Sequence, residues 1–174
     1  MADLALDARP TAPDAVVRRR LVASAVEGLD ALYLAELAAR PEVRQILHVA
    51  SDGVHADHLA ELIGFFAPGL EVVTLPAWDC LPYDRVSPSP DLMARRLEAL
   101  GHLLETGSGR ARLVITTANA LLQKVPPPEA IRSGLFGARV GERIDRDQLL
   151  ACLARTGYRR SGTVVEPGEF AAPA

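Results

Sequence analysis

Residues 23–30 hold the first spacing in the chain that could support chemistry. A phosphate-binding loop reads G-x-x-x-x-G-K-[ST]: backbone N–H groups hold the phosphates, the lysine reaches their terminal oxygens and the hydroxyl residue holds Mg²⁺. In this register the chain has Ala23, Gly28, Leu29 and Asp30. Leucine cannot neutralise a phosphate, and the aspartate would repel one. The pattern indicates either a degenerate phosphate loop or an ordinary strand–helix turn, and on this stretch alone the turn is the commoner explanation.

Two further pairs of side chains have a spacing that chemistry could use. His55 and His58 stand three residues apart on one predicted helix, but a metal site needs a third ligand and none is near in sequence. Asp79 and Asp84 lie on one loop, where paired carboxylates could act as acid and base. Aspartate more often forms turns in loops. We therefore expect a solvated helix face, a structural loop and no metal site.

Arginines occur in short runs that could contact phosphate or an acidic partner. The runs are Arg18–Arg20, Arg95 with Arg96, and Arg159 with Arg160. The whole chain has a net charge of −3, which argues against a dedicated nucleic-acid module. We expect each run to be a solvent-exposed edge.

The composition is that of a globular protein in a reducing compartment. Hydrophobic residues make up 49% and charged residues 24% of the 174 residues, which allows a packed core. Cys80 and Cys152 are far apart and form no C-x-x-C motif, so neither a disulfide nor a zinc site is expected. No apolar run approaches about 18 residues and no signal peptide is evident. We predict a cytoplasmic chain without a membrane span, with a mobile tail over 1–13.

The positions of these residues depend on an alternation of strands and helices. Apolar runs predict strands over 20–26, 44–50, 70–75 and 111–117. Helices are predicted over 29–40, from a cap at Ser51 or Asp52 to Pro68, from a cap at Ser89 to Gly107, and over 118–124. In the third helix Met93, Leu97, Leu100 and Leu104 form one apolar stripe. Repeated β-α units predict an α/β domain over 14–134, with a mostly parallel sheet flanked by helices.

The regular alternation of strands and helices ends after Gly134, and a small α+β unit is predicted over 135–174. We expect a strand over 136–144, a helix capped by Asp145 and ended by Gly157, and a strand over 162–170. About 40 residues are too few for a sizeable core, so this unit must lean on the first domain or be incomplete. An open sheet edge there would favour self-association.

The loop 75–91 carries the most specific motif. It holds the only tryptophan, Trp78, with Tyr83 and four prolines. The run LPAWDCLPYDRVSPSPDLMARRLEAL resembles the N-terminal region of the transcription-repair coupling factor family, Mfd, where W-[ED]-x-L-P-Y-[DE]-x-x-S-P opens the same helix. LVITTANALLQKVPPPE and VGERIDRDQLLACLARTGYRRSGTVVEPGEF look like later segments of the family, so the resemblance covers 20–170.

The resemblance implies a fold and an inactive nucleotide site. The family's N-terminal region is similar to UvrB, the damage-verifying protein of nucleotide excision repair, whose first strand carries a working phosphate loop and whose corresponding loop extends into an aromatic hairpin. Leu29 and Asp30 stand at the Lys-Thr positions of UvrB, which favours a degenerate phosphate loop. The loop here is too short for the hairpin, and we expect it to be pinned on the domain as a closed cover over an unused site. Its structural residues would be Trp78, Leu81, Pro82 and Tyr83.

The resemblance also implies partners. In the family the second domain recruits UvrA, and later domains bind RNA polymerase and translocate on DNA with ATP and Mg²⁺. Pro173 stands where the family has an arginine that contacts UvrA, so we expect UvrA binding to need the complete second domain. The partner-binding candidates in this chain are Arg159, Arg160, Glu169 and Phe170.

The resemblance implies that this chain is a non-catalytic scaffold module of a repair factor, and that the module itself needs no cofactor. Two alternatives remain open. One is a free-standing small α/β nucleotide-binding protein or enzyme, against which Leu29 and Asp30 speak. The other is a short regulatory protein that binds UvrA or other domains of the longer factor.

Overall fold

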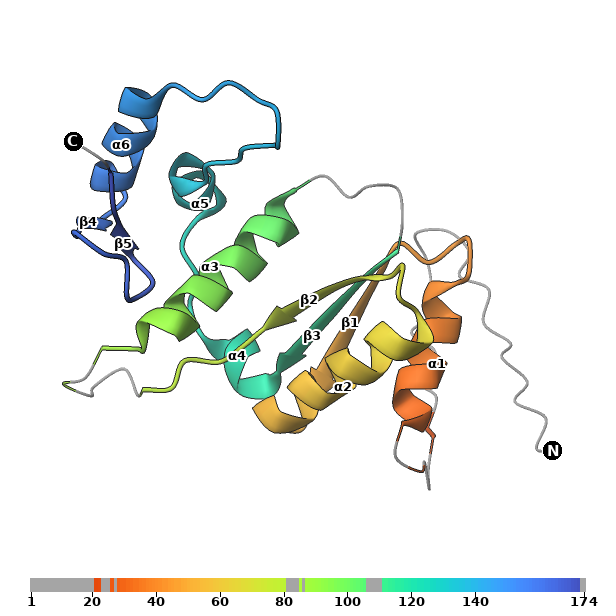
Figure 1. Ribbon diagram of the computed structural model, residues 1–174. Helices are drawn as coiled ribbons and strands as arrows, with labels where there is room; N and C mark the ends of the chain where they lie inside the picture. Colours follow the sequence, from red (N-terminus) through yellow and green to blue (C-terminus); the bar gives the residue numbers. More distant parts are fainter. Residues whose placement is uncertain are drawn as a thin grey trace.

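A three-stranded parallel sheet forms the centre of the chain (Figure 1). The computed structural model describes residues 21–22, 26, 28–80, 85, 87–105 and 111–172. The sheet consists of β1 (Gln45–Ala50), β2 (Glu71–Leu75) and β3 (Arg112–Thr117) in the order β1-β3-β2. These are three of the four strands predicted for the first domain, and the α/β class is confirmed. Of the fourth, over 20–26, only Leu21, Val22 and Val26 are described, and they lie outside any strand.

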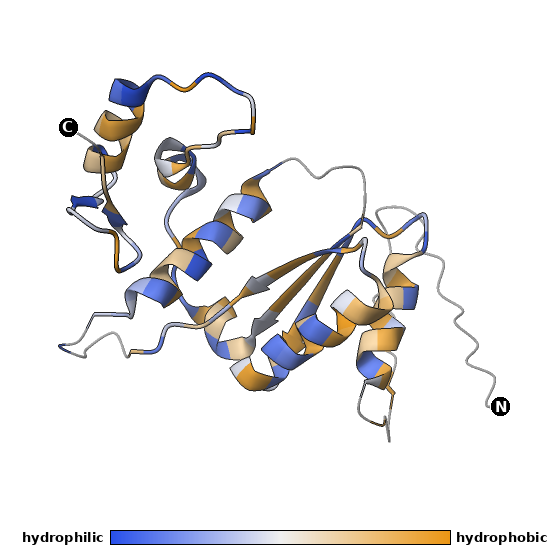
Figure 2. Cartoon of the chain, in the orientation of Figure 1, coloured by the Kyte–Doolittle hydropathy of each residue, from blue (hydrophilic) through white to orange (hydrophobic). Residues whose placement is uncertain are grey.

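Helices cover both faces of the sheet. One core cluster joins α1 (Leu29–Ala38) and α2 (Gly53–Phe66) to the face of β1 and β3 that carries Ile46 and Ile115. The opposite face of β2 packs on α3 (Pro90–Leu104) and on α5 (Pro128–Gly134), which the sequence reading missed. The short helix α4 (Ala118–Leu122) follows β3 directly. Figure 2 shows apolar residues along the strands and on the helix faces turned to them.

The helix starts follow the sequence signals. The side chain of Asp52 accepts a hydrogen bond of 2.8 Å from the N–H of His55, and Ser89 accepts one of 3.3 Å from Leu92. Pro90 is the first residue of α3, where its missing N–H costs nothing. The same rule explains α5, because Pro128 opens that helix directly after the prolines that follow α4.

The apolar stripe expected on α3 is half correct. Leu100 is buried and Leu104 packs against the core cluster on β2, whereas Met93 and Leu97 are exposed. The other buried residues of the helix are Arg96, Ala99 and Gly101. Ala99 belongs to the cluster on β2, and Gly101 faces Leu135.

The second unit contains less strand than expected. It has α6 (Arg146–Arg155), capped by Asp145, and a parallel pair of two-residue strands, β4 (Arg159–Arg160) and β5 (Glu169–Phe170). The strand expected over 136–144 is wrong, because this segment is irregular and turns at Gly141, whose φ is 92°. No partner strand lies beside it among the described residues, and an unpaired apolar run does not form a stable strand alone.

One close contact joins the second unit to the first. A Cβ added to Gly101 of α3 would lie 3.0 Å from Cδ2 of Leu135. Leu135 follows α5 directly, so the chain leaves the first domain across the surface of α3. Within the described ranges, no helix has the length and apolar character needed to cross a bilayer.

Candidate functional site

The turn at Gly28 is the place where a phosphate loop would act. Gly28 has φ of 83°, a left-handed conformation that favours glycine, and it precedes the first residue of α1. Two backbone N–H groups at this turn are already engaged. Leu29 donates to the carbonyl oxygen of Val26 at 3.0 Å, and Ala31 donates to Oδ1 of Asp30 at 2.8 Å. A carboxylate thus occupies the position that a bound anion would take at this helix start.

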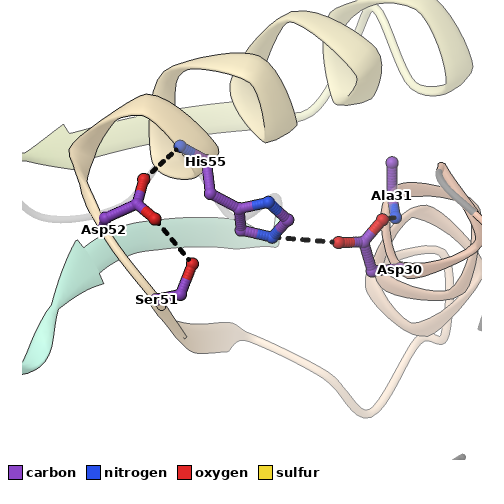
Figure 3. A network of polar contacts seen from close by, with 5 residues as sticks. All are labelled: Asp30, Ala31, Ser51, Asp52 and His55. Atoms are coloured by element: carbon purple, nitrogen blue, oxygen red, sulfur yellow. Dashed lines mark hydrogen bonds and ion pairs between the residues drawn. The ribbon is translucent and has the colours of Figure 1, made fainter.

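Asp30 also joins α1 to α2. Its Oδ2 lies 3.3 Å from Nε2 of His55, at the start of α2 (Figure 3). The backbone N–H of His55 donates to Asp52, which accepts a second hydrogen bond of 3.0 Å from the hydroxyl of Ser51. These hydrogen bonds to Asp52 lower the pKa of its carboxyl. His55 therefore lies in a polar network between two helices and not only on a solvated helix face.

His48 lies on β1 beneath this network. The centroids of the His48 and His55 rings are 6.5 Å apart, and His48 is half-buried. Burial lowers the pKa of His48, an effect that the charge of Asp30 partly opposes and that His55 adds to. Among the described residues, no three carboxylate, imidazole or thiol groups converge to hold a metal ion.

A hollow of about 350 Å³ opens at the carboxyl ends of all three strands. This edge is where ligands bind in open α/β sheets. Oδ1 of Asp57 lies 3.0 Å from Nη2 of Arg95, so these two exposed charges neutralise each other at the rim. The polar residues of the lining are Ser51, Asp52, Asp57, Thr74, Arg95, Thr117 and Asn119.

Trp78 is held by residues that the sequence reading did not connect to it. Its backbone N–H donates to Oε1 of Gln123 at 2.9 Å, and its ring centroid lies 4.4 Å from the guanidinium carbon of Arg96. Nη1 of Arg96 donates to the same oxygen of Gln123 at 3.2 Å and to the carbonyl oxygen of Pro76. The start of the loop is therefore fastened to α3 and to the residue after α4.

Arg96 is the main correction to the sequence reading. It was expected at a solvent-exposed edge, and the structure leaves it 1% exposed. Burial lowers the pKa of its guanidinium group. Its Nε and Nη2 find no hydrogen-bond partner in the part of the chain that the structure describes. The available signal was helical spacing, because Arg96 lies three residues before Ala99 and four before Leu100 and so shares their buried face.

Only part of the loop over 75–91 is described by the structure. Leu81, Pro82, Tyr83 and Asp84 lie outside the described residues, so the predicted role of the first three stays a prediction. The described part of the loop contacts α3 and Gln123, whereas the Gly28 turn lies beside α2. Asp79 accepts a hydrogen bond of 3.4 Å from the N–H of Ser89, which ties the two ends of the loop together.

The predicted partner-binding residues meet in the parallel pair β4–β5. Arg159 pairs with Glu169 and Arg160 with Phe170, and both arginines are exposed. Glu169 is engaged within its own loop, because its Oε2 accepts from the N–H of Val165 at 3.0 Å and of Glu166 at 3.4 Å. These hydrogen bonds lower the pKa of the Glu169 carboxyl. The structure thus brings the four residues together, with the two arginines as the accessible charges.

The fold and these sites define a class of protein: an α/β domain with a parallel sheet, followed by a small second unit. Comparison with known proteins identifies the family. The chain is 29% identical to the transcription-repair-coupling factor of Haemophilus influenzae over 93% of its length, and 31% identical to that of Escherichia coli over 94%. It is 38% identical to the factor of Myxococcus xanthus over 76%. The chain therefore belongs to the transcription-repair-coupling factor family.

The match covers a small part of those proteins. It spans 13%, 14% and 12% of the lengths of the three relatives, respectively. No protein-family model matches the chain. The resemblance that the tryptophan loop indicated is confirmed. Because the chain matches so little of the longer relatives, their activity can only be proposed for this protein.

Proposed function

We propose that this chain is the N-terminal, non-catalytic scaffold module of a transcription-repair coupling factor. The longer protein would be an ATP-driven DNA translocase that displaces stalled RNA polymerase and recruits UvrA during transcription-coupled nucleotide excision repair. The observation that carries the proposal is the similarity to transcription-repair-coupling factors along 93–94% of the chain in two relatives. RNA polymerase and DNA would be bound by other domains.

The absence of nucleotide chemistry in this module is supported by the Gly28 turn. Leu29 stands at the position of the phosphate-binding lysine, and Asp30 fills the helix start with its own carboxylate. A phosphate placed there would meet a negative charge and lose the N–H of Ala31 as a donor. This arrangement favours a degenerate phosphate loop over the alternative of a small nucleotide-binding enzyme.

Calorimetric titration of the chain with MgATP, and separately with UvrA, tests the proposal. We expect no heat of binding with MgATP. Saturable binding of MgATP would contradict the scaffold assignment and favour the nucleotide-binding alternative.

The titration with UvrA locates the recruitment surface. If the complete second domain is needed, the chain binds UvrA weakly, and a chain extended through that domain binds it tightly. If this chain alone binds tightly, the surface lies within it, and Arg159→Ala with Arg160→Ala should abolish binding. Arg139→Ala is the matched control, because Arg139 is another exposed arginine of the second unit outside β4–β5.

A further inference from the structure

The guanidinium group of Arg96 is a buried cation without a counter-charge in the described ranges. None of the ion pairs formed there includes Arg96. Arg112, another buried arginine, differs in this respect, because its Nε donates to Oε1 of Glu71 at 2.6 Å. A buried charge that lacks a partner destabilises a fold by several kcal/mol. A group that supplied the missing negative charge to Arg96 would therefore be held strongly.

One edge of this guanidinium group is available to such a partner. Nη1 already donates to the carbonyl oxygen of Pro76 and, at 3.2 Å, to Oε1 of Gln123. Nε and Nη2 are buried and find no acceptor among the described residues. These two nitrogens form the side edge of the planar group, and their parallel N–H bonds match the two oxygens of a carboxylate. The chemistry of the open edge is thus that of a two-pronged carboxylate receptor.

The charges around Arg96 favour a carboxylate over a phosphate. Its neighbour on α3, Arg95, is paired with Asp57 at 3.0 Å, and Lys124, beside Gln123, is exposed to solvent. Within the described ranges the buried positive charge at this place is that of Arg96 alone. One carboxylate balances it, whereas a phosphate group, with about two negative charges, would bury an excess of negative charge.

The segment 76–80 covers the guanidinium group and controls access to it. The ring centroid of Trp78 lies 4.4 Å from the guanidinium carbon, and Trp78 is itself only half-buried. The segment is fastened by the hydrogen bond from the backbone N–H of Trp78 to Gln123 and by a longer one, of 3.4 Å, from Ser89 to Asp79. A surface segment held by few contacts opens at a small fraction of the free energy of global unfolding. A ligand can therefore reach Nε and Nη2 when this segment lifts.

We propose that the Nε–Nη2 edge of Arg96 is a binding site for one carboxylate, which enters when the segment 76–80 lifts and is covered when it closes. The carboxylate is that of a small free acid or of an aspartate or glutamate side chain of another protein. The site does not depend on the scaffold role proposed above, and it stands whether or not the module recruits UvrA.

NMR titration of the full chain with sodium acetate, at an ionic strength held constant with sodium chloride, tests the proposal. The Nε–H signal of Arg96, assigned by its loss in Arg96→Lys, should move downfield and saturate, because Nε–H gains a charged acceptor. The emission of Trp78, the only tryptophan, should change along the same curve. Arg95→Ala is the matched control and should leave both curves unchanged, since Arg95 pairs with Asp57 at the surface.

A second variant tests the site without removing the arginine. Gln123→Glu should keep the fold, because its carboxylate accepts the same hydrogen bonds from Trp78 and Arg96. It places a negative charge on the guanidinium group in advance, so acetate should bind at least about tenfold more weakly.

A second probe, N-acetylaspartate N-methylamide, carries the carboxylate on an amino-acid side chain and distinguishes the two sources. Binding of both probes supports the proposal and assigns the site to a protein side chain. Binding of acetate alone supports it and assigns the site to a small free acid. An Arg96 signal that responds to neither probe would overturn the proposal, as would acetate binding that is undiminished in Gln123→Glu.

Discussion

The guanidinium carbon of Arg96 lies 4.4 Å from the ring centroid of Trp78, and both residues donate to one oxygen of Gln123. This arrangement explains why the single tryptophan of the chain stands in a proline-rich loop. The ring covers a buried cation, an interaction that gains strength when the cation is shielded from water. Arg96 in turn holds the carbonyl oxygen of Pro76, so one side chain fastens the exit of β2.

Arg96→Ala should lower the free energy of unfolding by about 2–3 kcal/mol, because it removes two charge-assisted hydrogen bonds and the cation under the ring. Denaturant titration measures the loss, and Trp78 emission should shift to the red as the ring gains solvent. Arg95→Ala is the matched control. It breaks only the exposed pair with Asp57 and should cost less than about 0.5 kcal/mol. Equal losses in the two variants would contradict the role given to Arg96.

Substitutions of Gln123 test the contribution of the oxygen that accepts hydrogen bonds from both Trp78 and Arg96. Gln123→Met leaves the N–H of Trp78 and Nη1 of Arg96 without their shared acceptor, so a loss of about 1–3 kcal/mol is expected. Gln123→Glu keeps the acceptor and adds a charge opposite the guanidinium, and it should be at least as stable as the unaltered chain. Chemical denaturation at neutral pH distinguishes the two. A destabilised Gln123→Glu variant would show that the oxygen is not the point of attachment.

The pair of Asp30 and His55 joins the beginnings of α1 and α2. Asp30→Asn keeps an oxygen that can accept from Ala31 but loses the charge. We expect a cost of at most about 1 kcal/mol in the free energy of unfolding, measured by denaturant titration, because both side chains are partly exposed. Asp57→Asn serves as the control, because it removes the carboxylate of another exposed pair. A loss in Asp30→Asn well above about 1 kcal/mol would contradict this assignment of a weak surface pair.

His48 should make the stability of the chain depend on pH. Burial lowers its pKa in the folded chain, so below about pH 6.5 the unfolded chain takes up the proton more readily than the folded one. Stability should therefore fall as the pH drops from about 6.5 toward the lowered pKa and level off below it. Thermal unfolding of His48→Gln should show a flatter profile in this window, whereas His102→Gln, at an exposed site on α3, should not. Identical profiles for the unaltered chain and His48→Gln would contradict this reading.

Gly101 tests the contact between the two units. Alanine favours the helix by about 1 kcal/mol over glycine, but its Cβ would meet Leu135 at 3.0 Å. Leu135 is half-exposed at the end of a flexible side chain, so we expect it to turn aside and Gly101→Ala to raise stability slightly. Gly101→Leu cannot be accommodated in this way and should lower it. Differential scanning calorimetry of both variants, with Gly64→Ala as a helical glycine in open space, measures the difference.

Most of the first domain could be predicted because its signals are local. The caps at Asp52 and Ser89, the first-turn proline of α3 and the apolar runs of β1, β2 and β3 act within a few residues of each other. The prediction of strands in the second unit was less successful because strands depend on contacts that are not local. A strand such as 136–144 is stabilised by a neighbour that lies far away in the sequence, and an apolar pattern contains no information about whether that neighbour is present.

The sequence by itself determined the α/β order, the helix caps, the family resemblance through the tryptophan loop and the presence of Leu29 where a phosphate loop has its lysine. Only the tertiary structure decided that Arg96 is buried, that Asp30 reaches His55 and that Gln123 joins Trp78 to α3. The physical reason is that a side chain of arginine, aspartate or glutamine is ordinarily favoured in water and enters the interior only where other groups satisfy it. Those partners stand 18 to 45 residues away in the chain, and they come together only when the sheet forms.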